Sequence, residues 1–142
     1  MNVLVVTETG QGRFQQEIRV GKHRFVADEP AEVGGLDSGP GPYDFLLAVL
    51  GACTAMTLRL YAERKDLPLE SVMVRLSHSK IYAADCVNCN TKEGMLVGID
   101  RAITLSGNLD ESQRARLMEI ADKCPVHRML TSEIEIRTVE ES

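Results

Sequence analysis

The chain contains 142 residues, with 44% apolar residues, 26% charged residues and a net charge of −5. This is the length of one domain, and the composition is that of a folded globular protein rather than a disordered chain. The acidic balance, without a cluster of Lys or Arg, argues against nucleic-acid binding. The longest nearly apolar run, 45–56, is shorter than the roughly 20 residues that span a bilayer, and no signal peptide is evident. We therefore expect a cytoplasmic protein with neither membrane nor nucleic acid as a partner.

Short β-rich segments alternate with glycine turns over residues 3–27 and predict a three-stranded antiparallel meander. Residues 34–42 hold four glycines and two prolines and predict a loop. The spacing of its glycines matches neither of the nucleotide-binding motifs GxGxxG and GxxxxGK(S/T). From about Pro42 to Lys65 the sequence predicts a helix that is apolar on nearly all sides, which is typical of a buried helix. A chain this small can hardly surround such a helix by itself, so we expect a second subunit to cover part of it.

The second half of the chain predicts a hairpin, a helix and a last strand. Residues 72–81 and 95–106 alternate between apolar and polar side chains, so they are expected to pair as a long antiparallel hairpin with Cys86 and Cys89 at its tip. A helix is expected from 108 to 124, where Pro125 ends it, followed by a further turn at 126–130 and a strand at 134–138. The order of elements predicts a single α+β domain over residues 1–142.

Two of the four cysteines lie at helical positions. Cys53 is in the middle of the long helix, where a cysteine is commonly a small buried apolar residue. Cys124 precedes Pro125, and if that proline opens a helical turn, backbone N–H groups and the helix dipole favour its thiolate. His127 and Arg128, one turn further on, would add positive charge. The alternative is a buried thiol at a helix break.

The other two cysteines form a single CxxC motif, Cys86 and Cys89. A zinc ion needs about four ligands and this motif supplies two, so Asp85, His78 or the same loop of a second subunit would have to complete a metal site. A transient disulfide and the absence of any chemical role are the alternatives. The βαβ context of a thioredoxin-like motif is not present.

Two longer segments resemble a known family. Residues 39–53, GPGPYDFLLAVLGAC, are similar to the central helix of the OsmC/Ohr superfamily, the osmotically inducible and organic hydroperoxide resistance proteins. Residues 121–127, ADKCPVH, are similar to the second cysteine of that superfamily in its Cys-Pro context. The resemblance implies an intertwined α+β homodimer in which the two long helices pack back to back and the active sites lie at the interface.

The resemblance also implies chemistry: a thiol-dependent peroxidase acting against oxidative stress. The thiolate of Cys53 would attack the O–O bond of an organic hydroperoxide and become a sulfenic acid, and Cys124 would condense with it to a disulfide. An unknown dithiol would then reopen the disulfide. No cofactor is required for this cycle.

The sequence departs from the peroxidase pattern at one position. Peroxidase members place a Glu about ten residues before the reactive cysteine, where it orients an Arg that stabilises the thiolate. Here that position is Tyr43, with Asp44 one residue later and turned by roughly 100° on a helix. The partner Arg is expected in the N-terminal meander, where Arg13 is favoured over Arg19 and Arg24.

Two readings compete with the peroxidase. One is a non-enzymatic dimer that binds a metal or a small ligand through Cys86 and Cys89. The other is a relative that shares the fold, keeps its cysteines for packing and holds a ligand pocket at the subunit interface.

Overall fold

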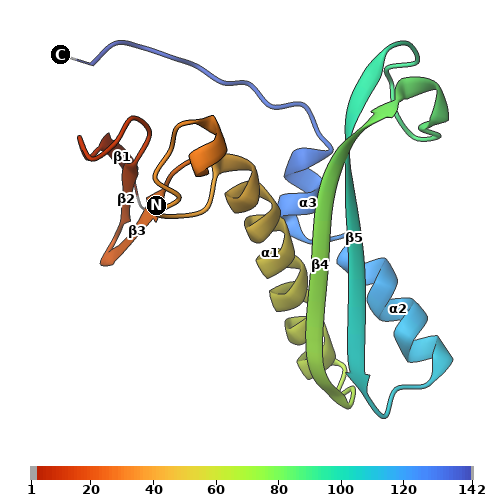
Figure 1. The fold of residues 1–142 in the computed structure, drawn as a ribbon. Coiled ribbons are helices and arrows are strands. Elements are labelled where there is room, and N and C mark those ends of the chain that lie inside the picture. Colours follow the sequence, from red (N-terminus) through yellow and green to blue (C-terminus); the bar gives the residue numbers. More distant parts are fainter. Residues whose placement is uncertain (1–2, 142) are drawn as a thin grey trace. The chain divides into compact units, whose positions relative to one another are not determined.

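The computed structural model describes residues 3–141, which divide into two compact units, one up to Ala48 and one from Val49 on. The first unit contains an antiparallel meander of β1 (Leu4–Glu8), β2 (Gln16–Val20) and β3 (His23–Ala27), in that spatial order (Figure 1). The buried Ile18 of the central strand lies opposite Val6 on one side and Phe25 on the other. The meander expected from the sequence is confirmed.

The glycine-rich loop after the meander is organised around Asp28, which is 2% exposed. The Asp28 carboxylate accepts hydrogen bonds from the Ser38 hydroxyl and from the backbone N–H groups of Glu29, Leu36 and Ser38. The bond from the Ser38 hydroxyl, helped by the backbone bonds, outweighs burial and lowers the pKa of Asp28. A short 3₁₀ turn, η1 (Ala31–Val33), lies within this loop. The N–H groups that could hold an anion are thus occupied by the protein's own carboxylate.

The long helix α1 (Pro42–Arg64) forms as expected, but only one of its faces is buried. Val49, Met56 and Leu60 remain 49%, 71% and 48% exposed, so a single chain does not surround the helix, as its small size leads us to expect. Cover by a second subunit stays a prediction. The helix also continues well past the apolar run of 45–56, and by length and composition alone it could cross a membrane, a test that the core helices of soluble proteins pass as well.

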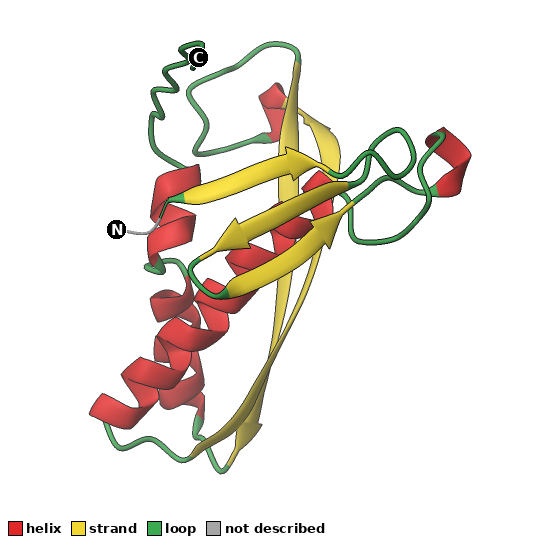
Figure 2. Cartoon of the chain, turned by 90° about the vertical axis from the view of Figure 1, so that its left-hand side faces the viewer, coloured by secondary structure: helices red, strands yellow, loops and turns green. Residues whose placement is uncertain are grey.

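The second unit is built on the hairpin of β4 (Leu69–Tyr82) and β5 (Met95–Gly107), with the short η2 (Ala83–Asp85) at its tip (Figure 2). The two strands pair antiparallel along their whole length, with Val74 opposite Ile103. Gly51 brings α1 close to β4, since a Cβ at this position would lie 2.8 Å from Leu76 Cδ1. The absence of a side chain at Gly51 therefore permits this close approach of helix and strand.

Two further helices complete this unit: α2 (Glu111–Ala121) and α3 (Pro125–Leu130). Asp110 begins α2 in a reciprocal capping arrangement with Gln113, in which each side chain accepts from the other's backbone N–H. The buried core of the unit joins α1, the start of β4 and α2; its members are Leu58, Ala62, Leu69, Leu109, Leu117, Ile120 and Ala121.

The strand expected at 134–138 does not form in this chain. Residues 133–141 are extended, but no strand within residues 3–141 pairs with them. An extended segment becomes a strand only when a neighbour supplies its hydrogen bonds, and alternation in the sequence does not say whether that neighbour exists.

Candidate active site

The junction between α2 and α3 places Cys124 at the start of a helix, as the Cys-Pro sequence predicts. Cys124 is extended, with φ −64° and ψ 143°, and is the N-cap of α3, while Pro125 occupies the first helical position. The sulfur accepts the backbone N–H of His127 at 3.3 Å, as a serine or threonine oxygen does at other helix starts. Cys124 has no exposed surface. Its sulfur is therefore held in one place by the backbone.

Thr54 of α1 lies beside this sulfur and is likewise fully buried. Its Oγ1 is 3.8 Å from Cys124 Sγ, 2.7 Å from the carbonyl oxygen of Leu50 and 3.0 Å from Arg101 Nη1. Because a hydroxyl has one hydrogen, Thr54 donates either to the Leu50 carbonyl or to a Cys124 thiolate, and it accepts from Arg101 in both cases. Thr54 thus joins the sulfur to a positive charge.

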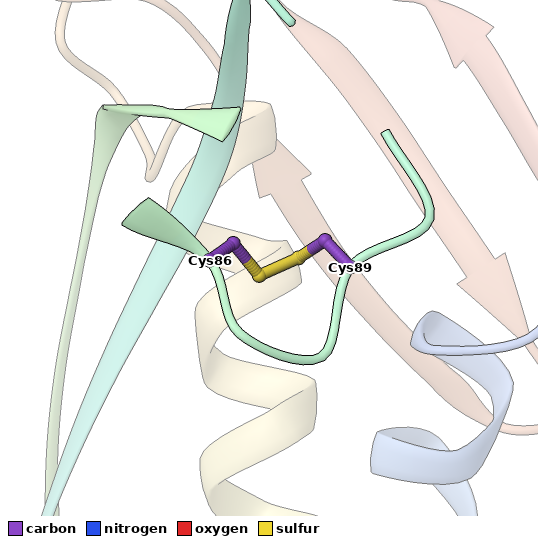
Figure 3. The surroundings of a disulfide bond; sticks show 2 residues. All are labelled: Cys86 and Cys89. Carbon is purple, nitrogen blue, oxygen red and sulfur yellow. A yellow bond between two sulfur atoms is a disulfide. The ribbon is translucent and has the colours of Figure 1, made fainter. Parts of the chain in front are cut away.

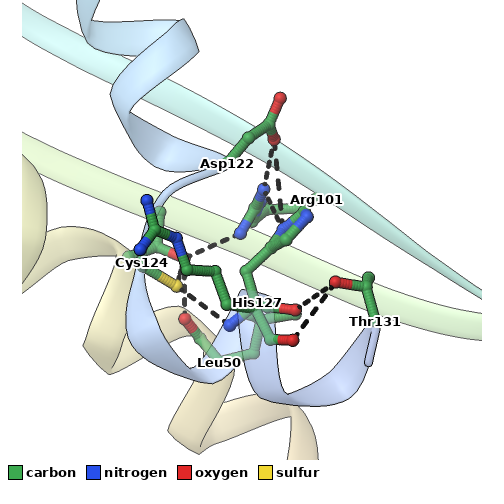
Figure 4. A network of polar contacts seen from close by, with 8 residues as sticks. Leu50, Arg101, Asp122, Cys124, His127 and Thr131 are labelled. Atoms are coloured by element: carbon green, nitrogen blue, oxygen red, sulfur yellow. Dashed lines mark hydrogen bonds and ion pairs between the residues drawn. The ribbon is translucent and has the colours of Figure 1, made fainter. Parts of the chain in front are cut away.

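Arg101 of β5 supplies that charge, and its side chain is only 11% exposed. Besides Thr54, its guanidinium contacts Asp122 Oδ1 at 2.9 Å and His127 Nδ1 at 3.0 Å (Figure 4). Arg101 therefore supplies a positive charge close to Cys124, through Thr54. The positive charge expected from His127 and Arg128 stays a prediction.

The environment of Cys124 favours its thiolate. Burial by itself raises the pKa of this thiol. Hydrogen bonds from the His127 backbone N–H and from the side chains of Thr54 and Cys53, together with the Arg101 charge, outweigh burial, so the pKa of Cys124 lies below its usual value. Cys53 precedes Thr54 on α1, so both cysteines of the sequence hypothesis belong to the same part of the fold.

Cys53 differs from Cys124 in exposure. It is half-buried, and it lines an open hollow of about 410 Å³ on the outer face of α1. Apart from Thr57, the neighbours of Cys53 in this hollow are apolar; the lining is Val49, Ala52, Cys53, Met56, Thr57, Leu60 and Pro125. A small molecule with an apolar body could reach Cys53 from solvent, whereas Cys124 is closed off.

The other expected catalytic residues, Arg13 and Asp44, lie in the first unit. Asp44 accepts the backbone N–H of Gly41 at 3.0 Å and so serves the start of α1, and Arg13 stacks on the ring of Phe14. No ion pair joins Arg13 to Asp44 within the described residues, because the carboxylate is turned toward its own helix start. Their part in the chemistry stays a prediction.

The remaining meander arginines are engaged elsewhere. Arg19 and Arg24 both contact Glu17, at 2.6 Å and 3.7 Å. This leaves Arg13 as the one of the three without a carboxylate partner in the part of the chain that the structure describes.

Cys86 and Cys89 form a disulfide at the hairpin tip, with their Cα atoms 5.5 Å apart (Figure 3). Sulfurs in a disulfide are not the thiolates that zinc requires. Among residues 3–141 no cluster of three or more His, Cys, Asp or Glu side chains could hold a metal ion. A zinc site here would need the reduced pair and ligands from another subunit, and it stays a prediction.

Arg101 is the residue that the sequence reasoning missed. It occupies an inward position of β5, between Ile99 and Ile103, in a strand whose other inward positions are apolar. A charged residue that interrupts a period-two apolar pattern is the signal that could have found it.

Comparison with known proteins finds one family model and several solved structures that are similar to this chain. A family model described as "OsmC-like protein" matches residues 35–139. None of the curated proteins matches the sequence well enough to count as a relative. Among solved structures, a putative osmotic stress induced and detoxification response protein from Psychrobacter arcticus is 19% identical, with a TM-score of 0.70 over 91% of this chain and 88% of that one.

Two structures of named hydroperoxide resistance proteins are similar as well. The organic hydroperoxide resistance protein OsmC from Legionella pneumophila is 19% identical, with a TM-score of 0.65 over 92% of this chain and 89% of that one. The organic hydroperoxide resistance protein OhrB of Bacillus subtilis is 17% identical, with a TM-score of 0.61 over 92% and 90%. At these identities the likeness concerns the α+β fold, which agrees with the fold expected from the sequence.

Proposed function

The chain belongs to the OsmC-like protein family, and on that premise we propose that it is a thiol-dependent peroxidase that reduces organic hydroperoxides in the cytoplasm without a bound cofactor. One observation carries the proposal: a half-buried thiol, Cys53, lines a hollow together with Pro125, and the residue before that proline is Cys124, a buried thiol whose pKa is lowered. A peroxidase that closes a disulfide between two cysteines needs one exposed and one buried thiol. The first thiol must reach the peroxide, and the second must be protected from it until the disulfide forms.

The reaction proceeds in three balanced steps. The Cys53 thiolate attacks the terminal oxygen of the hydroperoxide, the O–O bond breaks, and Cys53 becomes a sulfenic acid while the alkoxide leaves and takes up a proton from solvent to become an alcohol. The Cys124 thiolate then attacks the Cys53 sulfur, the S–S bond forms, the S–O bond breaks, and the departing hydroxide takes up a proton from solvent to become water. A dithiol reductant finally reduces this disulfide by exchange and is itself oxidised to a disulfide.

The contacts around Cys124 support its role in the second step. Attack on a sulfenic acid requires a thiolate. The N–H of His127 at 3.3 Å, the Thr54 hydroxyl at 3.8 Å and the Arg101 charge behind it all favour that form. Asp122 and His127 hold Arg101 in place at 2.9 Å and 3.0 Å. These residues are positioning residues, because they act on the chemistry through the sulfur.

The hollow beside Cys53 supports an organic rather than a purely inorganic peroxide. Its walls are aliphatic, and its volume of about 410 Å³ has room for a small apolar body. The alkyl or aryl part of a hydroperoxide would pack on these walls while its peroxide group meets the sulfur. Hydrogen peroxide has no apolar part and would gain nothing from them.

The decisive experiment follows the consumption of cumene hydroperoxide with dithiothreitol as reductant. We expect Cys53→Ser to abolish turnover. Without dithiothreitol and with excess peroxide, Cys124→Ser should accumulate sulfenic and then sulfinic acid at Cys53, seen by intact mass. The matched control, Cys86→Ser with Cys89→Ser, should turn over like the wild type. Peroxide consumption by Cys53→Ser at the wild-type rate would refute the proposal.

We further propose that the working unit is a homodimer formed through the outer face of α1. Val49, Met56 and Leu60 are exposed on this face, and with Cys53 they follow the 3-4 spacing of a helix–helix seam. A second copy would cover these side chains and roof the hollow beside Cys53. Met56→Lys should then give a monomer in sedimentation velocity, whereas Met118→Lys, the same change at an exposed methionine of α2, should leave the dimer intact. A monomeric wild type, or a dimeric Met56→Lys, would contradict this interface.

A further inference from the structure

The disulfide between Cys86 and Cys89 lies away from the proposed peroxide site. It is in the loop of residues 83–94 that joins β4 to β5 (Figure 3). Leu76 is paired with Arg101, and Tyr82, at the end of the strand, is paired with Met95. At 3.3 Å per residue, the six residues from Arg101 to Met95 place the tip roughly 20 Å along the strand from Arg101. Cys53 and Cys124 are therefore not its direct exchange partners within one subunit.

This disulfide contributes little as a cross-link. It joins two residues three apart in one loop, and a disulfide restricts the unfolded chain less as the loop it closes becomes shorter. The loop is also closed without it. The backbone N–H of Ala83 donates to the Gly94 carbonyl at 2.8 Å, that of Cys86 donates to the Ala83 carbonyl at 3.1 Å, and Ala83 is fully buried. Reduction of the bond would thus leave the loop anchored at its base.

The same disulfide is open to attack. Val87, between the two cysteines, is 89% exposed, its neighbour Asn88 is exposed, and both cysteines are half-buried rather than enclosed. Exchange needs a thiolate to approach one sulfur in line with the S–S bond, and access sets its rate together with the pKa values of the thiols. In this respect the pair is the opposite of Cys124, which has no exposed surface.

We propose that Cys86 and Cys89 form a second redox centre, a thiol–disulfide exchange site for an external dithiol, which works independently of the peroxide site. One thiolate of the dithiol attacks a sulfur of the pair, the S–S bond breaks and a mixed disulfide forms. The second thiol of the partner then displaces the protein sulfur. The dithiol leaves as a disulfide, and Cys86 and Cys89 hold the two electrons and two protons that it has lost. A disulfide acceptor reverses the sequence.

The test uses the wild-type protein. Samples are equilibrated anaerobically in buffers with graded ratios of reduced to oxidised glutathione, and with dithiothreitol, then quenched in acid, alkylated and digested with trypsin. The tryptic peptide of residues 81–92 contains Cys86 and Cys89 but neither Cys53 nor Cys124, so its mass reports this pair alone. Circular dichroism of the same samples reports the fold.

We expect the peptide to pass from no alkyl groups to two within the glutathione series, to return when the ratio is reversed, and to do so with an unchanged circular dichroism spectrum. A pair that resists dithiothreitol, or whose reduction unfolds the protein, would be a structural disulfide and would overturn the proposal. A pair that stays reduced at every ratio would overturn it as well. Cys53→Ser should give the same titration whether or not it retains peroxide turnover, so the outcome is separate from that of the peroxidase test.

Discussion

Replacing Thr54 by valine isolates the contact between α1 and the charge on Arg101. Valine has nearly the same shape, so the packing of this fully buried position is kept while the hydroxyl is lost. Three contacts of the hydroxyl disappear: the acceptor for Arg101 Nη1 at 3.0 Å, the donor for a Cys124 thiolate at 3.8 Å and the bond to the Leu50 carbonyl. The loss at Leu50 matters least, because that carbonyl oxygen keeps its helical N–H partner.

The cost can be worked out from burial. The Arg101 side chain is 11% exposed, so water cannot fully replace the lost acceptor. A buried donor left without a partner costs about 1–3 kcal/mol, and more if it is charged. We therefore expect Thr54→Val to lower the free energy of unfolding by about 1–3 kcal/mol.

A double-mutant cycle with Arg101→Met assigns this cost to the pair. Urea unfolding of the wild type, both single variants and the double variant, all at one protein concentration, gives a coupling energy, which should be about 1 kcal/mol or more. Thr54→Ser, which keeps the hydroxyl, should form the Cys53–Cys124 disulfide at the wild-type rate after one equivalent of peroxide, and Thr54→Val should form it more slowly. If the two single changes add within about 0.5 kcal/mol and Thr54→Val resolves normally, the link from Arg101 to Cys124 through Thr54 is refuted.

Three further predictions concern the core, the loop and the pH dependence. Leu117→Ala removes a fully buried side chain of the core cluster and should cost about 2–5 kcal/mol in urea unfolding; a loss under about 1 kcal/mol would contradict its central place. The pKa of Asp28 is lowered from 3.8 in the folded state, so its stabilisation is present above that pH and is lost as the pH falls through the folded value. Asp28→Asn should be less stable than the wild type at pH 7 and equal to it in strong acid, whereas an equal gap at both pH values would exclude this linkage. Because Arg101 helps to lower the pKa of Cys124, Arg101→Met should move the acid limb of the disulfide-formation rate to higher pH in stopped-flow measurements, and an unmoved limb would show that the charge does not act on the sulfur.

The parts of the fold that could be predicted depend on local signals. Glycine turns, and apolar and polar side chains that alternate along the chain, indicate the meander and the hairpin. The CxxC motif could be placed at the hairpin tip because it lies between the two alternating segments. Cys124 could be placed at a helix start because proline at the first helical position is a local preference. Each of these features is decided by residues close together in the sequence.

The parts that could not be predicted depend on partners distant in sequence. The contacts of Arg101 come from β5, α1 and the α2–α3 junction. The residues next to Arg101 in the sequence do not indicate that Thr54 and Asp122 are its partners. Asp44 could be read as a displaced catalytic carboxylate, but its oxygen is satisfied by a backbone N–H three residues earlier. The segment 134–138 alternates like a strand, although a strand also requires a neighbour.

Cys53 and Thr54 are consecutive residues of α1, and this affects which properties of the protein a substitution can alter. Consecutive helix residues point roughly 100° apart, so one side of the helix backbone carries the entrance lined by Val49 and Met56, and the other carries the polar contacts of Thr54. The helix acts as a partition. For the peroxidase proposed above, substitutions at the entrance would alter which peroxides react without disturbing the groups around Cys124, and substitutions around Thr54 would alter the rate of disulfide formation without altering substrate choice. The two properties of the proposed reaction could then evolve separately, on opposite sides of a single helix.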